Sequence, residues 1–247
     1  MDSATGSAKP GALRASAEAA IPLLTDDRVP YLARLPEAAS AALIAAGVEL
    51  RYPARTVVLM KGEPSSHVLL VLEGWLKVTD GSPGGHEALL ALRGPGDVIG
   101  ESAALQDTSR SASVTTLEPI RAVVISSDRF RAFLDEHPIA TRQLMALVTD
   151  RMRAADRKRL ELAVCGVKER LARLLLELAQ HHGEPVPEGV LVKVPLTQQE
   201  LAGAVGSSRE SVTRLLRELR ERGYITTRRQ ALVVVRPEML RRIGGSA

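Results

Sequence analysis

The sequence contains a single cysteine, Cys165, among 247 residues, and this scarcity excludes two kinds of chemistry. No disulfide can form within one chain, and the thiolates needed for a Cys-ligated iron–sulfur cluster are missing. The five histidines are scattered, without acidic partners at metal-ligand spacing, so no metal site is predicted. The adjacent pair, His181 and His182, is expected to face solvent before the loop at Gly183.

Long apolar runs are also missing. No stretch of about 18 apolar residues is present, so no membrane-spanning helix is predicted. The start of the chain is rich in Ala, Ser and Gly and lacks the compact apolar centre of a signal peptide, so we expect a cytoplasmic protein. Nucleophile-and-base spacing, a Walker-type glycine loop and a kinase signature are absent too, which disfavours an enzyme or the regulatory module of a channel or kinase.

The positive charge is concentrated in the C-terminal part of the chain. Residues 165–247 carry 14 Lys and Arg against 9 Asp and Glu, a net +5, whereas residues 1–164 carry 19 against 20, a net −1. A basic excess of this kind attracts a polyanion such as nucleic acid. A DNA-binding segment is therefore expected in the C-terminal part.

Two short helices joined by a tight turn are predicted in this basic part. In SSRESVTRLL (207–216), Ser207 and Glu210 form a capping box that would begin the second helix. Upstream, Thr197 and Glu200 form another capping box, which would begin the first helix. The second helix has one apolar stripe, made of Val212, Leu215, Leu216 and Leu219. Two capped helices around a glycine-closed turn are typical of a helix-turn-helix.

The opposite face of the second helix is polar. Arg209, Glu210 and Arg214 offer two forked donors and an acceptor, although Glu210 and Arg214 could equally form an ordinary surface ion pair. The next segment, YITTRRQALVVV (224–235), is predicted as a hairpin whose tip is basic. A hairpin in this place would make a winged helix-turn-helix, and its tip could lie against DNA phosphates.

The fold class predicted for the whole chain is α+β, because short β-like runs between Val48 and Val124 are followed by long helical stretches. The expected parts are a disordered N-terminal extension (1–29), an antiparallel β-roll (30–136), a long dimerisation helix (137–164) and a winged helix-turn-helix domain (165–247).

The long helix has more apolar surface than a small barrel can cover. One predicted stripe consists of Leu144, Leu147, Val148, Met152 and Ala155. We expect this stripe to meet a second copy of itself in a symmetric homodimer. Such a dimer would present two recognition helices to successive major grooves, about 34 Å apart.

Between its strands the β region contains GDVIGESAALQDTSRSASV (96–114), in which Gly-Glu follows a strand and Arg-Ser-Ala follows a turn. This segment resembles the phosphate-binding cassette of cyclic-nucleotide-binding domains. With the SRES…R helix behind it, the chain from about residue 30 onward resembles transcription regulators of the cAMP receptor protein and FNR (Crp–Fnr) family. The resemblance implies a homodimeric regulator whose partners are double-stranded DNA, RNA polymerase and a cyclic nucleotide. The branch with an oxygen-sensing cluster is excluded by the single cysteine.

The chemistry of the cassette suits a cyclic phosphate. Gly100 and Arg110 can supply backbone donors and a bidentate cation to the phosphate, and Glu101 can accept from a ribose hydroxyl. The resemblance assigns the same roles to Glu101, Arg110 and Ser111, and adds Arg151 of the long helix. The predicted site comprises Gly100, Glu101, Ser102, Arg110, Ser111 and Arg151, with Ala155 and Asp156 at the base.

Those last two residues depart from the family pattern. Where cAMP receptor proteins contact adenine with a threonine and a following serine or asparagine, this chain has Ala155 and Asp156. Alanine cannot hydrogen-bond the base, and an aspartate fits guanine N1–H and N2–H better than the edge of adenine. We expect cAMP first, while cGMP, another nucleotide, or DNA binding without an effector stay open.

For DNA, the resemblance implies that Arg209 and Arg214 each contact guanine and that Glu210 accepts from cytosine N4, pairings that suit these side chains. The expected target is a palindrome with half-sites like TGTGA/TCACA. The rest of the predicted DNA-binding set is Thr197, Gln198, Ser207, Ser208, Thr213, Arg217, Arg228 and Arg229.

Overall fold

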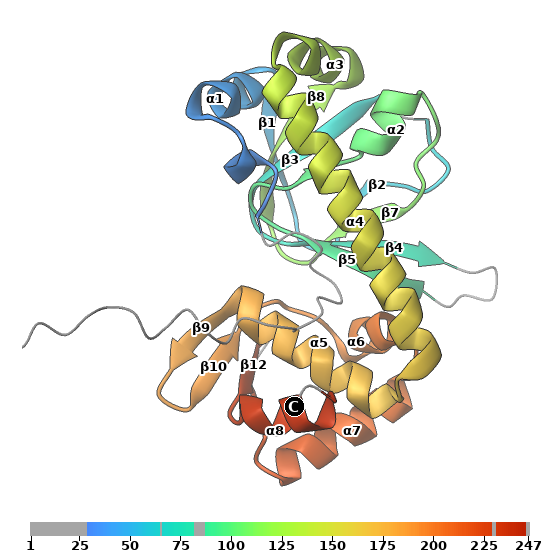
Figure 1. The fold of residues 1–247 in the computed structure, drawn as a ribbon, viewed down its shortest axis with the longest axis vertical. Coiled ribbons are helices and arrows are strands. Elements are labelled where there is room, and N and C mark those ends of the chain that lie inside the picture. Colours follow the sequence, from blue (N-terminus) through green and yellow to red (C-terminus); the bar gives the residue numbers. More distant parts are fainter. Residues whose placement is uncertain (1–28, 65, 82–86, 229–230, 246–247) are drawn as a thin grey trace, which may run out of the picture.

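The computed structural model describes residues 29–64, 66–81, 87–228 and 231–245. In Figure 1 a β-rich part lies above a mainly helical part, and one long helix, α4 (Pro138–Val164), runs from the first to the second. The predicted α+β fold, with its β-roll, long helix and winged helix-turn-helix, is confirmed. The predicted N-terminal extension, apart from Val29, lies outside the described residues. Among the described helices none is long and apolar enough to cross a membrane.

The β-roll is made of two antiparallel sheets of four strands, in the orders β1-β8-β3-β6 and β2-β7-β4-β5. Its strands are β1 (Val48–Tyr52), β2 (Val57–Leu59), β3 (His67–Glu73), β4 (Leu76–Gly81), β5 (Glu87–Arg93), β6 (Val98–Ile99), β7 (Ser113–Thr116) and β8 (Ile120–Ser126). Leu69 and Ala122 from one sheet share an apolar core with Leu76 and Val114 from the other. The short strands predicted from the sequence therefore close around a core of their own.

Helices cover one end of this roll, as the upper part of Figure 1 shows. They are the short helix η1 (Leu32–Arg34), α1 (Glu37–Ala45), α3 (Ser127–Glu136) and the first turns of α4, while α2 (Glu101–Gln106) lies inside the cassette. Leu144 and Leu147 of α4 are buried in the apolar core beneath these helices, together with Phe130. The predicted single stripe on α4 is therefore wrong in part, because Val148 and Met152 point away from that core and are exposed.

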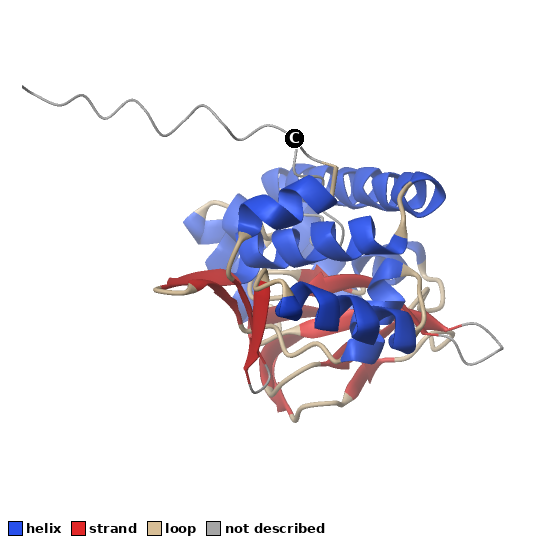
Figure 2. Cartoon of the chain, turned by 90° about the horizontal axis from the view of Figure 1, so that it is seen from below, coloured by secondary structure: helices blue, strands red, loops and turns tan. Residues whose placement is uncertain are grey.

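The C-terminal part is a winged helix-turn-helix. Its elements are α5 (Val167–His182), β9 (Gly183–Val186), β10 (Gly189–Val192), α6 (Gln198–Val205), α7 (Arg209–Glu221), β11 (Ile225–Arg228), β12 (Ala231–Val234) and α8 (Pro237–Ile243). Strands β11 and β12 pair antiparallel, with Arg228 opposite Ala231, which confirms the predicted hairpin. In the view from below, most helices gather on one side of the strands (Figure 2). Arg229, which was predicted at the basic tip of this hairpin, lies outside the described residues.

The expectation that both adjacent histidines face solvent is wrong for His182. Its ring packs edge-on against Trp75 of the β-roll, with 4.3 Å between the ring centroids. Burial, together with the neighbouring His181, lowers the pKa of His182 from 6.5 to about 4. The last turn of α5 is therefore part of the contact between the two domains, which a local sequence pattern could not indicate.

Candidate functional site

Helix α7 is the predicted recognition helix, but it begins one residue later than expected. Its N-cap is Ser208, whose hydroxyl accepts a hydrogen bond from the Ser211 N–H at 3.2 Å. Ser207 instead closes the preceding helix, because its N–H donates to the Ala202 carbonyl at 3.0 Å. The predicted capping box at Ser207 is therefore wrong, whereas Arg209 lies in the first turn as predicted.

The predicted base-reading side chains lie together on the exposed face of α7. A shallow concavity of about 610 Å³ on this face is lined by Arg209, Glu210, Thr213, Arg214, Arg217 and Arg220. Arg220 was not predicted, although its place three residues after Arg217 puts it on the same face. Backbone and Ser208 hydrogen bonds lower the pKa of Glu210, so this carboxylate is an ionised acceptor among cationic donors.

The first helix of the motif, α6, has the capping box that the sequence predicts. The Thr197 hydroxyl accepts from the Glu200 N–H at 3.2 Å, and Glu200 Oε2 accepts from the Thr197 N–H at 2.7 Å. The hydroxyl of Thr213 on α7 donates to Gln198 Oε1 at 2.6 Å. The hydrogen bond between Thr213 and Gln198 joins the two helices of the motif at the surface where both were predicted to meet DNA.

The wing is tied to the adjacent hairpin. The guanidinium of Arg228 donates to Glu188 Oε1 at 3.0 Å, and both side chains are about half exposed. An exposed pair of this kind is held weakly, by about 0 to 1 kcal/mol, so a DNA phosphate could replace the carboxylate.

The predicted cassette forms a tight turn around a buried arginine. Gly100 has a left-handed backbone (φ 85°) in which other residues are strained, and a Cβ there would lie 2.5 Å from Arg110 Nη1 and displace it. Arg110 is 5% exposed, and its guanidinium donates to the carbonyls of Gly100 at 3.0 Å and His67 at 2.5 Å. Both partners are neutral, and burial lowers the pKa of Arg110 despite the opposing charges of Glu101 and Glu63. A buried cation on neutral partners is suited to receive an anion.

Glu101 connects the cassette to the long helix. Arg151 Nη1 of α4 donates to Glu101 Oε1 at 2.7 Å, and Arg151 Nη2 donates to the Val98 carbonyl at 3.1 Å. Both side chains of the ion pair are mostly buried. The structure therefore brings together Glu101 and Arg151, the two residues through which the predicted ligand would contact the β-roll and the long helix.

The other residues of the predicted nucleotide site lie on the surface. Ser102 and Ser111 are exposed, as are Ala155 and Asp156 on α4. The Asp156 carboxylate accepts from Arg159 Nη1 at 3.1 Å, and both side chains are mostly exposed. In the part of the chain that the structure describes, the two residues at the base-contacting places are therefore left exposed.

Comparison with known proteins follows this division into two functional parts. A family model described as a cyclic nucleotide-binding domain matches residues 49–137, and a Crp-like helix-turn-helix domain matches residues 169–243. The CRP-like cAMP-activated global transcriptional regulator of Mycobacterium tuberculosis (strain ATCC 25618 / H37Rv) is 31% identical over 191 residues, which cover 77% of this chain and 85% of that protein. The cAMP-activated global transcriptional regulator CRP of Escherichia coli O157:H7 is 30% identical over 186 residues, covering 74% of this chain and 88% of that protein.

Among solved structures, the c-di-GMP responsive global regulator CLP of Xanthomonas campestris aligns with a TM-score of 0.69 and 27% sequence identity, over 81% of this chain and 99% of that chain. The chain belongs to the Crp/Fnr family of transcription regulators. It combines a cyclic-nucleotide-binding domain with a DNA-binding helix-turn-helix domain, and its family is one of regulators rather than enzymes. The names of its relatives point to different effectors, cAMP in some and c-di-GMP in another.

Proposed function

We propose that the protein is a homodimeric, sequence-specific transcription regulator that reads a TGTGA-like palindrome and is switched by a cyclic nucleotide. The observation that carries this proposal is the buried Arg151–Glu101 ion pair at 2.7 Å. It links the predicted nucleotide site to α4, so a ligand whose hydroxyl competes for Glu101 would act directly on this helix. Membership of the Crp/Fnr family supports the same division of roles.

The homodimer is supported by the exposed side of α4. Met145 is 67% exposed, Val148 45% and Met152 60%, and spacings of three and four residues place them on one helix face. Large apolar side chains so exposed along one stripe fit a contact with the same helix of a second copy. Ala155 continues this stripe one turn further, so a partner chain would cover it. RNA polymerase as a partner stays a prediction.

DNA reading is assigned to Arg209, Glu210 and Arg214. Replacing Arg214 by alanine should weaken binding to the TGTGA/TCACA palindrome by about 1 to 3 kcal/mol and relax one base position, because a bidentate contact to guanine is lost. Arg228→Ala is the matched control on the wing, and it should weaken binding to every sequence alike. Because one phosphate contact is lost, the slope of log affinity against log salt concentration should become shallower by about one unit. Fluorescence anisotropy on cognate and scrambled duplexes at several salt concentrations measures both. Equal losses of Arg214→Ala on the two duplexes would exclude a base-reading role.

The effector is assigned to the cassette around Arg110, with cAMP as the first candidate. Titration calorimetry with cAMP, cGMP and c-di-GMP should give saturable heat with one of them, and Arg110→Ala should abolish it because the buried cation for the phosphate is removed. Selective binding of a guanine nucleotide would assign the base contact to Asp156.

A specific observation favours a second candidate, the same DNA-binding dimer without nucleotide control. Ala155 offers no hydrogen bond to a base, and the Asp156 carboxylate is already paired with Arg159. In that case none of the three nucleotides gives heat, and the protein binds the palindrome equally with and without them.

A further inference from the structure

The contact between the β-roll and the winged domain is close and apolar. Leu89, Leu92 and Leu117 of the β-roll are buried in the same cluster as the core of the helix-turn-helix. Gly203 on α6 lies so near strand β5 that a Cβ would come within 2.6 Å of the Glu87 carbonyl oxygen. The two domains are therefore packed directly on each other through α6, rather than being joined only by the chain between α4 and α5.

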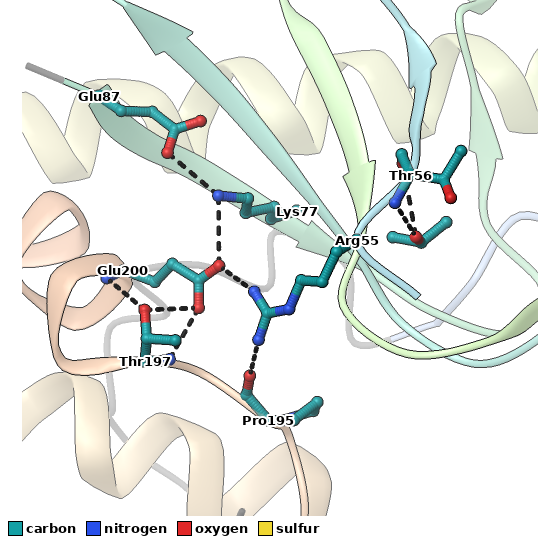
Figure 3. A network of polar contacts seen from close by, with 8 residues as sticks. Arg55, Thr56, Lys77, Glu87, Pro195, Thr197 and Glu200 are labelled. Carbon is teal, nitrogen blue, oxygen red and sulfur yellow. Dashed lines mark hydrogen bonds and ion pairs between the residues drawn. The ribbon is translucent and has the colours of Figure 1, made fainter. Parts of the chain in front are cut away.

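A polar network also crosses this contact, as Figure 3 shows from close by. Glu200 Oε1 accepts from Arg55 Nη1 at 2.6 Å and lies 3.2 Å from Lys77 Nζ. Lys77 also donates to Glu87 Oε2 at 3.0 Å. The side chains of Glu200 and Lys77 are only 6% and 11% exposed. We refer to Arg55, Lys77, Glu87 and Glu200 as the interdomain network.

Glu200 has two functions in this arrangement, one for each oxygen. Its Oε2 caps α6 by accepting from Thr197, and its Oε1 accepts from the β-roll. Burial alone would raise the pKa of Glu200, but the Thr197 hydrogen bonds and the charge of Lys77 lower it, so the carboxylate stays ionised. The first helix of the DNA-binding motif is thus fixed to the β-roll by the same side chain that begins it.

Arg55 is held in place by its own backbone. It has a left-handed conformation (φ 61°), which residues other than glycine rarely adopt, and its N–H donates to the Thr116 carbonyl at 2.9 Å. From this turn the guanidinium reaches both Glu200 and the Pro195 carbonyl, the latter at 3.1 Å. An arginine fixed at its backbone and bonded to two points of the winged domain restricts the rotation of that domain.

We propose that Arg55 and Lys77 act through Glu200 as positioning residues that fix the orientation of the recognition helix relative to the β-roll. The inference rests on the proposed reading of a palindrome by a dimer. On a palindrome, once one recognition helix of the dimer is bound, the second binds its half-site in an intramolecular step, which raises the affinity for the full site. This rise in affinity exists only when both helices are held at the matching distance and angle. Loosening the interdomain network should leave the affinity for one half-site intact and remove the advantage of the full site.

The test uses two substitutions that break the network from opposite sides. Lys77→Met removes the cation, while Glu200→Gln removes the carboxylate charge and keeps a side chain that can still form the capping box. Lys61→Met is the control, because Lys61 forms an ion pair with Asp80 at 2.6 Å that stays within the β-roll, although it is more exposed than the pair of Lys77 and Glu200. The conservative variant Lys77→Arg should behave like the wild type, since it keeps a cation in the same place.

Binding is measured on a full palindrome and on a duplex with one half-site, with full-length protein. If the correctly oriented fraction falls to about a tenth, Lys77→Met and Glu200→Gln should each weaken full-site binding about tenfold. Half-site binding should change less than about twofold, and the double variant should lose no more than either single one. Equal weakening on both duplexes would show that the substitutions damage the helix-turn-helix itself and would overturn the proposal.

A second measurement is independent of DNA. Trp75 is the only tryptophan in the chain, and it lies at the domain contact, against His182. Lys77→Met and Glu200→Gln should shift its emission to the red, whereas Lys61→Met should not. An unchanged emission would overturn the proposal, as would a shift with full-site binding unaltered. If the wild-type protein itself binds the full site no better than the half-site, the proposed reading of a palindrome is wrong. The tryptophan emission then still tests whether the interdomain network holds the two domains together.

Discussion

Acid is expected to destabilise this protein through His182, whose ring is packed between the two domains. The ring lies 4.3 Å from Trp75, and its Nε2 is buried without a hydrogen-bond partner among the described residues. Burial, followed by the effect of His181, lowers the pKa of His182 from 6.5 to about 4. The folded protein therefore favours the neutral ring, whereas the unfolded chain binds a proton at ordinary histidine pH.

The sign and size of the effect follow from this difference. Because the folded pKa lies below the unfolded one, the unfolded chain binds more protons between pH 4 and 6.5, and stability falls as the pH decreases through that range. At 1.36 kcal/mol per pH unit, the whole difference corresponds to about 3 kcal/mol as an upper limit. Between pH 7.5 and pH 5.0, about 2 kcal/mol of this should be lost per chain.

Urea unfolding at those two pH values, on wild type and on His182→Phe, isolates the contribution. Phenylalanine keeps an aromatic edge against Trp75 but cannot ionise, and every other titrating group is common to both proteins. The variant should lose about 2 kcal/mol less than the wild type on acidification. Equal losses in the two proteins would refute the assignment of acid sensitivity to this contact.

Two further predictions concern glycines whose replacement by alanine should disturb the structure, each for a different reason. Gly100→Ala should weaken nucleotide binding about tenfold or more in calorimetry, because the left-handed turn is strained and the new Cβ would displace the Arg110 guanidinium. Gly203→Ala favours the helix by about 1 kcal/mol on propensity alone, yet its Cβ would meet the Glu87 carbonyl. It should therefore shift the Trp75 emission to the red while circular dichroism shows unchanged helix content, and an unshifted emission would contradict the close contact of α6 with β5.

Local patterns in the sequence were sufficient for much of the DNA-binding motif. The capping box of Thr197 and Glu200 was predicted because all of its partners lie within four residues. The start of α7 was missed by one residue because Ser207 and Ser208 are both good N-caps. The choice between them was made by the end of α6, where the Ser207 N–H is already bonded to Ala202.

The periodicity of apolar residues also left open which face of the long helix α4 packs on the β-roll. It identified apolar positions but not which of them face the β-roll, and Leu144 and Leu147 lie on that side while Val148 and Met152 do not. The interdomain network could not be predicted at all, because Arg55 and Glu200 are 145 residues apart and the local capping box already accounts for Glu200. Contacts of this kind depend on how two finished domains meet.

The same long helix contacts both the predicted nucleotide site and the surface that holds the winged domain. Arg151 binds Glu101 in the cassette, and Lys158, two turns further along α4, donates to the Leu89 carbonyl of β5 at 2.6 Å. Residues seven apart lie on nearly the same helix face, so a ligand that pulls Glu101 from Arg151 would move the face that holds β5. Because β5 is also the strand on which α6 rests, a rotation of α4 would reach the recognition helix without passing through the connection between α4 and α5. A double-mutant cycle of Lys158 with Glu101 measures the coupling between the two contacts.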